Sequence, residues 1–199
     1  QSVHRWILYS IDKKTGKIIW EQLAHEGAPI EKRHIKSTYA NSTPATDGRI
    51  VVSWFGSEGV YAYDFKGRLL WKVDIGRIDL GAYDIPTVEW GPASSPIIWN
   101  NLVILQVDTQ ADSFLLALDA ATGELLWMHK EFEGPRGDTA PRQLSGRGLA
   151  YWSDGRAERI VYVTPGYRLI ALDAKSGNPI QSFGKDGVVD LKLEDDQNM

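Results

Sequence analysis

Residues 116–127, with the sequence LALDAATGELLW, decide the fold of this chain. Leu116 and Leu118 are two residues apart, so their large apolar side chains point to the same face, as expected of a half-buried strand. A second apolar run follows the turn. Asp119 can hydrogen-bond the backbone two residues ahead, and Gly123 can adopt a positive φ at little cost. The stretch therefore predicts a β-hairpin that ends on an aromatic residue, Trp127.

The same pattern occurs four times. The other copies are YSIDKKTGKIIW (9–20), YAYDFKGRLLW (61–71) and IALDAKSGNPIQSF (170–183). Their aspartates, Asp12, Asp64, Asp119 and Asp173, are separated by 52, 55 and 54 residues. This period suits a four-stranded propeller blade better than a helical repeat, which is typically about 33–47 residues long.

Two further strand-like runs precede each of the last three copies, and helical periodicity of useful length occurs nowhere. The second strands read RIVVSWF (49–55), LVILQVD (102–108) and RIVYVTP (159–165). We therefore predict an all-β chain, a β-propeller segment of about three and a half four-stranded antiparallel blades forming a single domain over residues 1–199. The half blade covers residues 1–40, the full blades cover 43–76, 94–133 and 147–187, and VVDLKL (188–193) begins another strand.

Propellers close with 4–8 blades, so this count indicates a piece of a larger propeller. A four-blade ring assembled from both ends of the chain is the competing interpretation.

Composition excludes several kinds of protein. The 199 residues carry 22 Lys and Arg against 26 Asp and Glu, a net charge of −4, so we expect no nucleic-acid partner. The chain has no cysteine, which excludes disulfides, thiolate nucleophiles and Cys-ligated metals. No apolar run approaches the roughly 20 residues of a transmembrane segment, and no secretion signal is present at Gln1.

With these repeats in view, residues 117–127 resemble the tryptophan-docking repeat of pyrroloquinoline quinone (PQQ) propeller proteins. The resemblance implies that Trp20, Trp71 and Trp127 pack between neighbouring blades, a pattern from which Phe183 departs. Residues 1 to about 112 resemble non-catalytic PQQ-like repeat proteins related to the outer-membrane assembly propeller. Residues from about 113 onward resemble the N-terminal blades of PQQ-dependent dehydrogenases of the glucose dehydrogenase type.

The resemblance also implies a cofactor contact in the segment APRQLSGRG (140–148). PQQ carries three carboxylates, which Arg can bind in a bidentate manner. In the dehydrogenases an Arg before Gly contacts the cofactor, and Arg147 holds that position; Gln143 stands where relatives place a His. The alternative is a surface loop whose arginines are solvated.

A catalytic base and a metal site cannot be assigned from the sequence. Alcohol oxidation by PQQ needs a carboxylate base and a Lewis acid, usually Ca²⁺, and in the family these residues lie in later blades, so we expect Ca²⁺ to be bound outside this chain. Asp138, Asp154 and Asp186 stand beside glycines and are interpreted as turn residues.

His25 and His34, with Glu26 and Glu31, lack tight ligand spacing and are interpreted as parts of a solvated loop, so no metal site is predicted.

The resemblance implies part of a periplasmic or cell-envelope quinoprotein dehydrogenase that oxidises a sugar or an alcohol with PQQ. As an isolated chain we expect it to be inactive. The alternative is a non-enzymatic propeller scaffold of the outer-membrane assembly type, which binds proteins through its loops.

Overall fold

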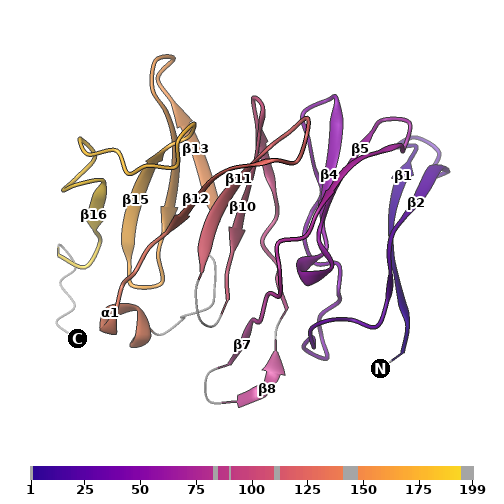
Figure 1. Cartoon of the computed structure of the whole chain (residues 1–199), viewed down its shortest axis with the longest axis horizontal. Coiled ribbons are helices and arrows are strands. Elements are labelled where there is room, and N and C mark those ends of the chain that lie inside the picture. Colours follow the sequence, from indigo (N-terminus) through magenta and orange to yellow (C-terminus); the bar gives the residue numbers. More distant parts are fainter. Residues whose placement is uncertain (1, 83–84, 90, 110–112, 141–147, 194–199) are drawn as a thin grey trace.

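The computed structural model describes residues 2–82, 85–89, 91–109, 113–140 and 148–193. As predicted, the chain is all-β and consists of antiparallel sheets. Figure 1 shows the sheets side by side in chain order, with the N-terminal hairpin at one end of the row and the last sheet at the other. The described residues therefore form an open row, and the four-blade ring is not observed.

Three sheets have four strands each, and two hairpins accompany them. The N-terminal hairpin consists of β1 (His4–Ile11) and β2 (Ile18–Gly27). The first four-stranded sheet contains β3 (Ala45–Thr46), β4 (Ile50–Trp54), β5 (Val60–Asp64) and β6 (Leu69–Val73). The second contains β9 (Ile97–Trp99), β10 (Leu102–Val107), β11 (Phe114–Asp119) and β12 (Leu125–Lys130). The third contains β13 (Leu149–Ser153), β14 (Glu158–Val163), β15 (Arg168–Asp173) and β16 (Val188–Asp190).

Three short elements lie in the connections. The hairpin of β7 (Gly81–Ala82) and β8 (Ile85–Glu89) follows the first sheet and was not predicted from the sequence. A 3₁₀ turn, η1 (Gly56–Glu58), joins β4 to β5, and a four-residue helix, α1 (Pro135–Asp138), follows β12. No helix in the described part of the chain is long and apolar enough to cross a membrane.

The repeat aspartates form the hairpin turns. Asp119 Oδ1 accepts hydrogen bonds from the backbone N–H groups of Ala121 and Thr122 at 2.8 and 2.9 Å. Gly123 closes the turn by donating to the carbonyl oxygen of Asp119 at 2.8 Å, with φ of +76°. Asp12 and Asp173 accept hydrogen bonds from the two corresponding backbone N–H groups in their own turns. The side chain thus satisfies donors that the turn would otherwise leave unpaired.

The last strand of the N-terminal hairpin, of the first sheet and of the second sheet each contacts the next unit through a tryptophan. The indole Nε1–H groups of Trp20, Trp71 and Trp127 donate to the carbonyl oxygens of Phe65 (3.0 Å), Ala120 (2.9 Å) and Ala174 (3.1 Å), respectively. Each acceptor is the residue that follows the repeat aspartate of the next unit. The contact therefore links neighbouring units at the same point of every repeat.

Apolar side chains fill the spaces between neighbouring units. Trp6, Leu8, Phe55, Tyr61 and Tyr63 are buried between the N-terminal hairpin and the first sheet. The space between the first and second sheets holds a larger cluster that includes Val52, Trp54, Trp71, Leu105 and Leu118. The space between the second and third sheets holds Leu102, Ile104, Trp127, Ile160, Ile170 and Leu172, among others. The cores thus lie between sheets, so each unit depends on its neighbours for burial.

The strand predicted to begin within 188–193 is present as β16, whereas the second strand that the hairpin pattern of 170–183 predicts before Phe183 is not formed. Instead β16 pairs with β15 and completes the third sheet. Pro179 forms only an isolated bridge with Leu172. Proline has no N–H and a fixed φ, so it cannot continue a hydrogen-bonded ladder at this position. The chain then turns, with Gly187 N–H donating to the Phe183 carbonyl oxygen at 2.9 Å, before β16 begins.

The Trp71 contact predicts unequal costs for one substitution at two equivalent glycines. An ideal Cβ at Gly123 would lie 2.9 Å from the Trp71 ring, whereas at Gly16, which also has a positive φ, it would meet nothing within 4 Å. Gly16→Ala is expected to cost about 1–2 kcal/mol of unfolding free energy from backbone strain alone. Gly123→Ala is expected to cost about 1–3 kcal/mol more, because the ring must move.

Urea unfolding of the two variants and the wild type measures this difference. Equal losses of unfolding free energy would show that the indole contact does not constrain the turn.

Candidate functional site

Gln143 and Arg147, the residues predicted to contact a cofactor, lie outside the described residues. They belong to the connection between β12 and β13, which also contains α1. On the described side of this segment, Gly148 has φ of +79° and no atom within 4 Å of an ideal Cβ position. The structure does describe how the start of the same connection is attached to the third sheet.

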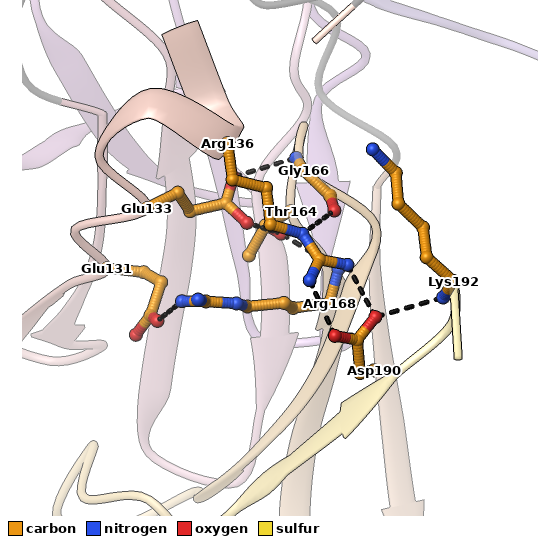
Figure 2. A network of polar contacts seen from close by, with 8 residues as sticks. All are labelled: Glu131, Glu133, Arg136, Thr164, Gly166, Arg168, Asp190 and Lys192. Carbon is orange, nitrogen blue, oxygen red and sulfur yellow. Dashed lines mark hydrogen bonds and ion pairs between the residues drawn. The ribbon is translucent and has the colours of Figure 1, made fainter. Parts of the chain in front are cut away.

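Glu133 attaches this connection to the turn between β14 and β15. Its carboxylate accepts hydrogen bonds from the Thr164 hydroxyl at 2.5 Å and from the Gly166 N–H at 2.7 Å. Figure 2 shows the three residues converging below α1. A Cβ at Gly166 would lie 2.4 Å from Glu133 Oε1, so the carboxylate can approach this backbone only because the residue is glycine.

Arg136, within α1, makes a second attachment. Its Nε–H donates to the Gly166 carbonyl oxygen at 2.5 Å, and its two terminal nitrogens bind both oxygens of Asp190 in β16. The Lys192 N–H also donates to Asp190, at 2.9 Å (Figure 2). The Arg136 guanidinium, followed by the Lys192 N–H, lowers the pKa of Asp190 to about 2. Two elements far apart in the sequence are thus joined by a charged, bidentate contact.

A cavity of about 50 Å³, lined by both polar and apolar side chains, lies beside this network, between the second and third sheets. Its polar lining includes Gln106, Asp108, His129, Glu131, Glu133 and Tyr162. Asp108 follows β10, Glu131 and Glu133 follow β12, and Thr164 follows β14, so the cavity is built where these three strands end. The Arg168 guanidinium donates to Glu131 Oε1 at 3.0 Å from the side of the third sheet (Figure 2).

The cavity has a negative electrostatic character. Burial raises the pKa of Tyr162, and the charges of Glu131 and Glu133 raise it further. Burial lowers the pKa of His129, although Glu131, whose Oε2 lies 3.9 Å from Nε2, opposes the shift. Burial thus favours the neutral form of His129, and the carboxylates of the lining offer hydrogen-bond acceptors to a guest. Such a site suits a cation or a donor-bearing group and repels an anion.

Sequence reasoning missed this cavity. The available signal was the alternation of His129, Glu131 and Glu133, which an extended chain places on one face. The contribution of Gln106 and Asp108 could not be inferred, because it depends on the pairing of β10 with β11 and of β11 with β12.

The N-terminal histidines and glutamates take separate partners. Glu31 is buried and pairs with Arg77, and Glu26 pairs with Arg5 at 3.0 Å. His34 Nδ1 accepts a hydrogen bond from the Lys36 N–H at 3.1 Å. Across the described ranges, no group of three or more His, Cys, Asp or Glu side chains is positioned to hold a metal ion.

Comparison with known proteins identifies the family. Residues 68–198 match the model of the PQQ family, described as "Glucose/ethanol/alcohol dehydrogenase, beta-propeller domain". The chain belongs to this family. The match begins within the turn between β5 and β6, and it therefore includes the second and third sheets and the connection that contains Arg147.

Individual relatives agree with this assignment. The chain is 34% identical over 111 residues to "Alcohol dehydrogenase (quinone), dehydrogenase subunit" of Gluconobacter oxydans (strain 621H), covering 55% of this chain and 14% of that protein. It is 29% identical over 121 residues to the "Glycerol dehydrogenase large subunit" of the same organism, covering 56% of this chain and 16% of that protein. The chain thus spans about one-seventh of the length of these relatives.

Solved structures show the same fold. BamB from Moraxella catarrhalis superposes with a TM-score of 0.55 at 16% identity, over 86% of this chain and 41% of that one. A europium-containing methanol dehydrogenase superposes with a TM-score of 0.51 at 12% identity, over 86% of this chain and 37% of that one.

The described cavity does not fit the cofactor after which the PQQ family is named. PQQ carries three carboxylates, whereas the cavity presents the carboxylates of Asp108, Glu131 and Glu133. The carboxylates of PQQ and those of the cavity carry like charges, which repel strongly in a partly buried site. No step of PQQ chemistry is therefore assigned to the cavity.

The Asp190–Arg136 pair predicts a pH dependence of stability. The pKa of Asp190 falls from 3.8 to about 2 on folding, so the pair stabilises the fold above about pH 4. This contribution is lost as the pH falls from about 4 to about 2. We expect it to be about 1 kcal/mol, because solvent reaches both side chains. Asp190→Asn should remove it.

Urea unfolding at pH 7 and at pH 2.5–3 measures this, with Asp186→Asn, an exposed turn residue nearby, as the control. If Asp190→Asn lost the same unfolding free energy at both pH values, the ionised pair would not be the cause.

Proposed function

We propose that this chain is part of a quinoprotein dehydrogenase that oxidises a sugar or an alcohol with PQQ in the periplasm. The match of residues 68–198 to the PQQ dehydrogenase propeller family carries the proposal. The names of the curated relatives, a quinone-linked alcohol dehydrogenase and a glycerol dehydrogenase, support a hydroxyl-bearing substrate. Both are named as subunits, which supports a protein partner for the whole enzyme.

Within this function the chain contributes structure and one edge of the cofactor site. The inter-unit contacts of Trp20, Trp71 and Trp127 support the proposal that these are tryptophan-docking repeats. Arg147 is proposed to bind a carboxylate of PQQ, and Gln143 to donate a hydrogen bond beside it. PQQ, when bound, supplies the electron acceptor for the alcohol; the catalytic base and Ca²⁺ ligands are proposed to lie elsewhere in the protein.

The first prediction of this proposal concerns Arg147 in the full-length protein. A charge-assisted Arg–carboxylate hydrogen bond contributes about 1.5–3 kcal/mol, so Arg147→Ala should weaken PQQ affinity by about 10- to 150-fold. Arg147→Lys should recover part of the affinity, because an ammonium lacks the planar fork. Titration of the apoprotein with PQQ, followed by fluorescence quenching, measures the affinity.

Arg156→Ala is the matched control. Arg156 is exposed on the turn after Asp154, whose Oδ1 accepts a hydrogen bond from its backbone N–H, so the side chain can be removed without loss of that bond. Equal PQQ affinity of the wild type and a folded Arg147→Ala variant would instead favour the non-enzymatic scaffold.

The second prediction is that the isolated 199-residue chain gives no turnover. With PQQ, Ca²⁺, glucose or ethanol and a dye acceptor present, dye reduction should not exceed that of PQQ and Ca²⁺ alone. Reduction above this level would place the catalytic base within the chain.

A further inference from the structure

Two equivalent places in the repeat differ in polarity. In the first sheet, Trp54, Val60 and Val73 form a row across β4, β5 and β6. In the second sheet, the corresponding row across β10, β11 and β12 is Gln106, Leu115 and His129. The two rows are equivalent because in each sheet the next pair on the same face contains the repeat tryptophan, Ala62 opposite Trp71 and Ala117 opposite Trp127.

The fold itself does not require polar residues in this row. Trp54 and Val73 pack in the apolar cluster between the first and second sheets, and Ile75, two residues beyond Val73, joins them. Glu131 stands two residues beyond His129, where the first sheet has Ile75. Three apolar positions of one interface are thus replaced by Gln, His and Glu in the next. A buried polar side chain stabilises a protein only when it is hydrogen-bonded.

The Gln106 amide is not fully satisfied. The residue is only 8% exposed, and it lines the cavity. Its Nε2 donates to Asp108 Oδ1 at 3.3 Å, while its Oε1 accepts no hydrogen bond from any described residue. Most buried side-chain polar atoms in proteins have a partner, so an orphaned acceptor facing a cavity points to a ligand or to ordered water.

The imidazole beside it is similarly placed. His129 Nε2 is buried and makes no hydrogen bond within the described part of the chain. The His129 side chain is 11% exposed. Leu115 in β11 pairs with Gln106 of β10 on one side and with His129 of β12 on the other. Two unsatisfied polar atoms therefore lie on the same face of the second sheet.

The surrounding charge is negative. Glu131 is paired with Arg168, but both oxygens of Glu133 accept hydrogen bonds from neutral donors, Thr164 and Gly166. Arg136, the other nearby cation, is engaged by Asp190. Among the described residues, the unpartnered oxygen of Gln106 thus lies in a lining with carboxylates, whose oxygens favour a cation over an anion.

Cavity size and ligand spacing restrict the guest. One water needs roughly 10–15 Å³ of such space, so about 50 Å³ accommodates a small ion with a few waters. The described side chains do not bring three His, Cys, Asp or Glu groups to one point, so an ion here must retain water ligands. Mg²⁺ behaves in this way, since it keeps several waters and binds proteins through one or two carboxylates.

We propose that this cavity binds one hydrated divalent cation of the Mg²⁺ class through the Gln106 carbonyl oxygen and the carboxylates of Asp108 and Glu131. The proposed ligands do not include Arg147 or Gln143, the residues of the proposed PQQ contact. Because the cation site is tested without PQQ or substrate, its failure would leave the proposed function untouched.

Isothermal titration calorimetry of the chelator-treated 199-residue chain with MgCl₂, at physiological ionic strength, tests the proposal. The wild type should bind one Mg²⁺ per chain, with NaCl giving no comparable heat. Gln106→Met removes the carbonyl oxygen at nearly constant length, and His129→Val copies the residue of the preceding unit. Gln106→Met should weaken Mg²⁺ binding about tenfold or more, the loss expected for a hydrogen bond or ligand to a charged group.

Gln181→Met, at an exposed position, is the matched control and should bind as the wild type does. In the presence of chelator, the melting temperatures of Gln106→Met and His129→Val should equal or exceed that of the wild type, because an unsatisfied buried group has been removed. Absence of saturable Mg²⁺ binding by the wild type, or equal affinity of Gln106→Met, would overturn the proposal. So would a lower melting temperature of both variants in chelator, which would show that the polar row serves the fold.

Discussion

The hydrogen bond from a tryptophan indole to the following repeat is the contact on which the rest of this structure depends. A single four-stranded sheet cannot bury both of its faces, and the cores of this chain lie between sheets. The Trp71 and Trp127 rings fill part of these cores, and their Nε1–H groups fix the position of the next turn through Ala120 and Ala174. Because the ring packs directly against Gly123 or Gly177, the turn residue and the indole of the preceding unit constrain each other.

Much of this arrangement could be predicted from the sequence, because it is local and repeated. The Asp119 turn depends on residues within four positions of one another, and its recurrence at Asp12, Asp64 and Asp173 gave the period of the repeat. The end of the third sheet could not be predicted in this way. There Pro179 prevents the expected strand, and β16 pairs with β15 only after an intervening turn. The cavity between the second and third sheets was missed for a related reason: its residues are brought together by strand register and by the packing of two sheets.

Two carboxylates, the buried Glu58 and the partly buried Glu133, connect segments at the edge opposite the turns that the tryptophans contact. Glu58, in the turn between β4 and β5, accepts a hydrogen bond at 3.1 Å from the Ile30 N–H in the preceding connection. Burial raises the pKa of Glu58, in spite of that hydrogen bond. Glu133 makes the equivalent bond with the roles of turn and connection exchanged. It lies in the connection between β12 and β13, and it accepts a hydrogen bond from the Gly166 N–H in the turn between β14 and β15. In both cases one carboxylate satisfies backbone donors of a second segment, so the sheets are joined at both edges.

The tryptophan hydrogen bonds and the carboxylate hydrogen bonds leave the residue types in the row between them free to differ from one interface to the next. Between the first and second sheets, Trp54 and Val73 close the edge with apolar contacts. Between the second and third sheets, the same register positions hold Gln106 and His129, while the Trp127 hydrogen bond is retained at 3.1 Å. A chain fixed at one edge by the indole and at the other by Glu133 can accept polar residues between them without loss of the sheet arrangement. The repeat therefore supplies a frame in which one interface is filled by apolar side chains and the next contains a cavity with polar groups, beside the connection that begins at Glu133.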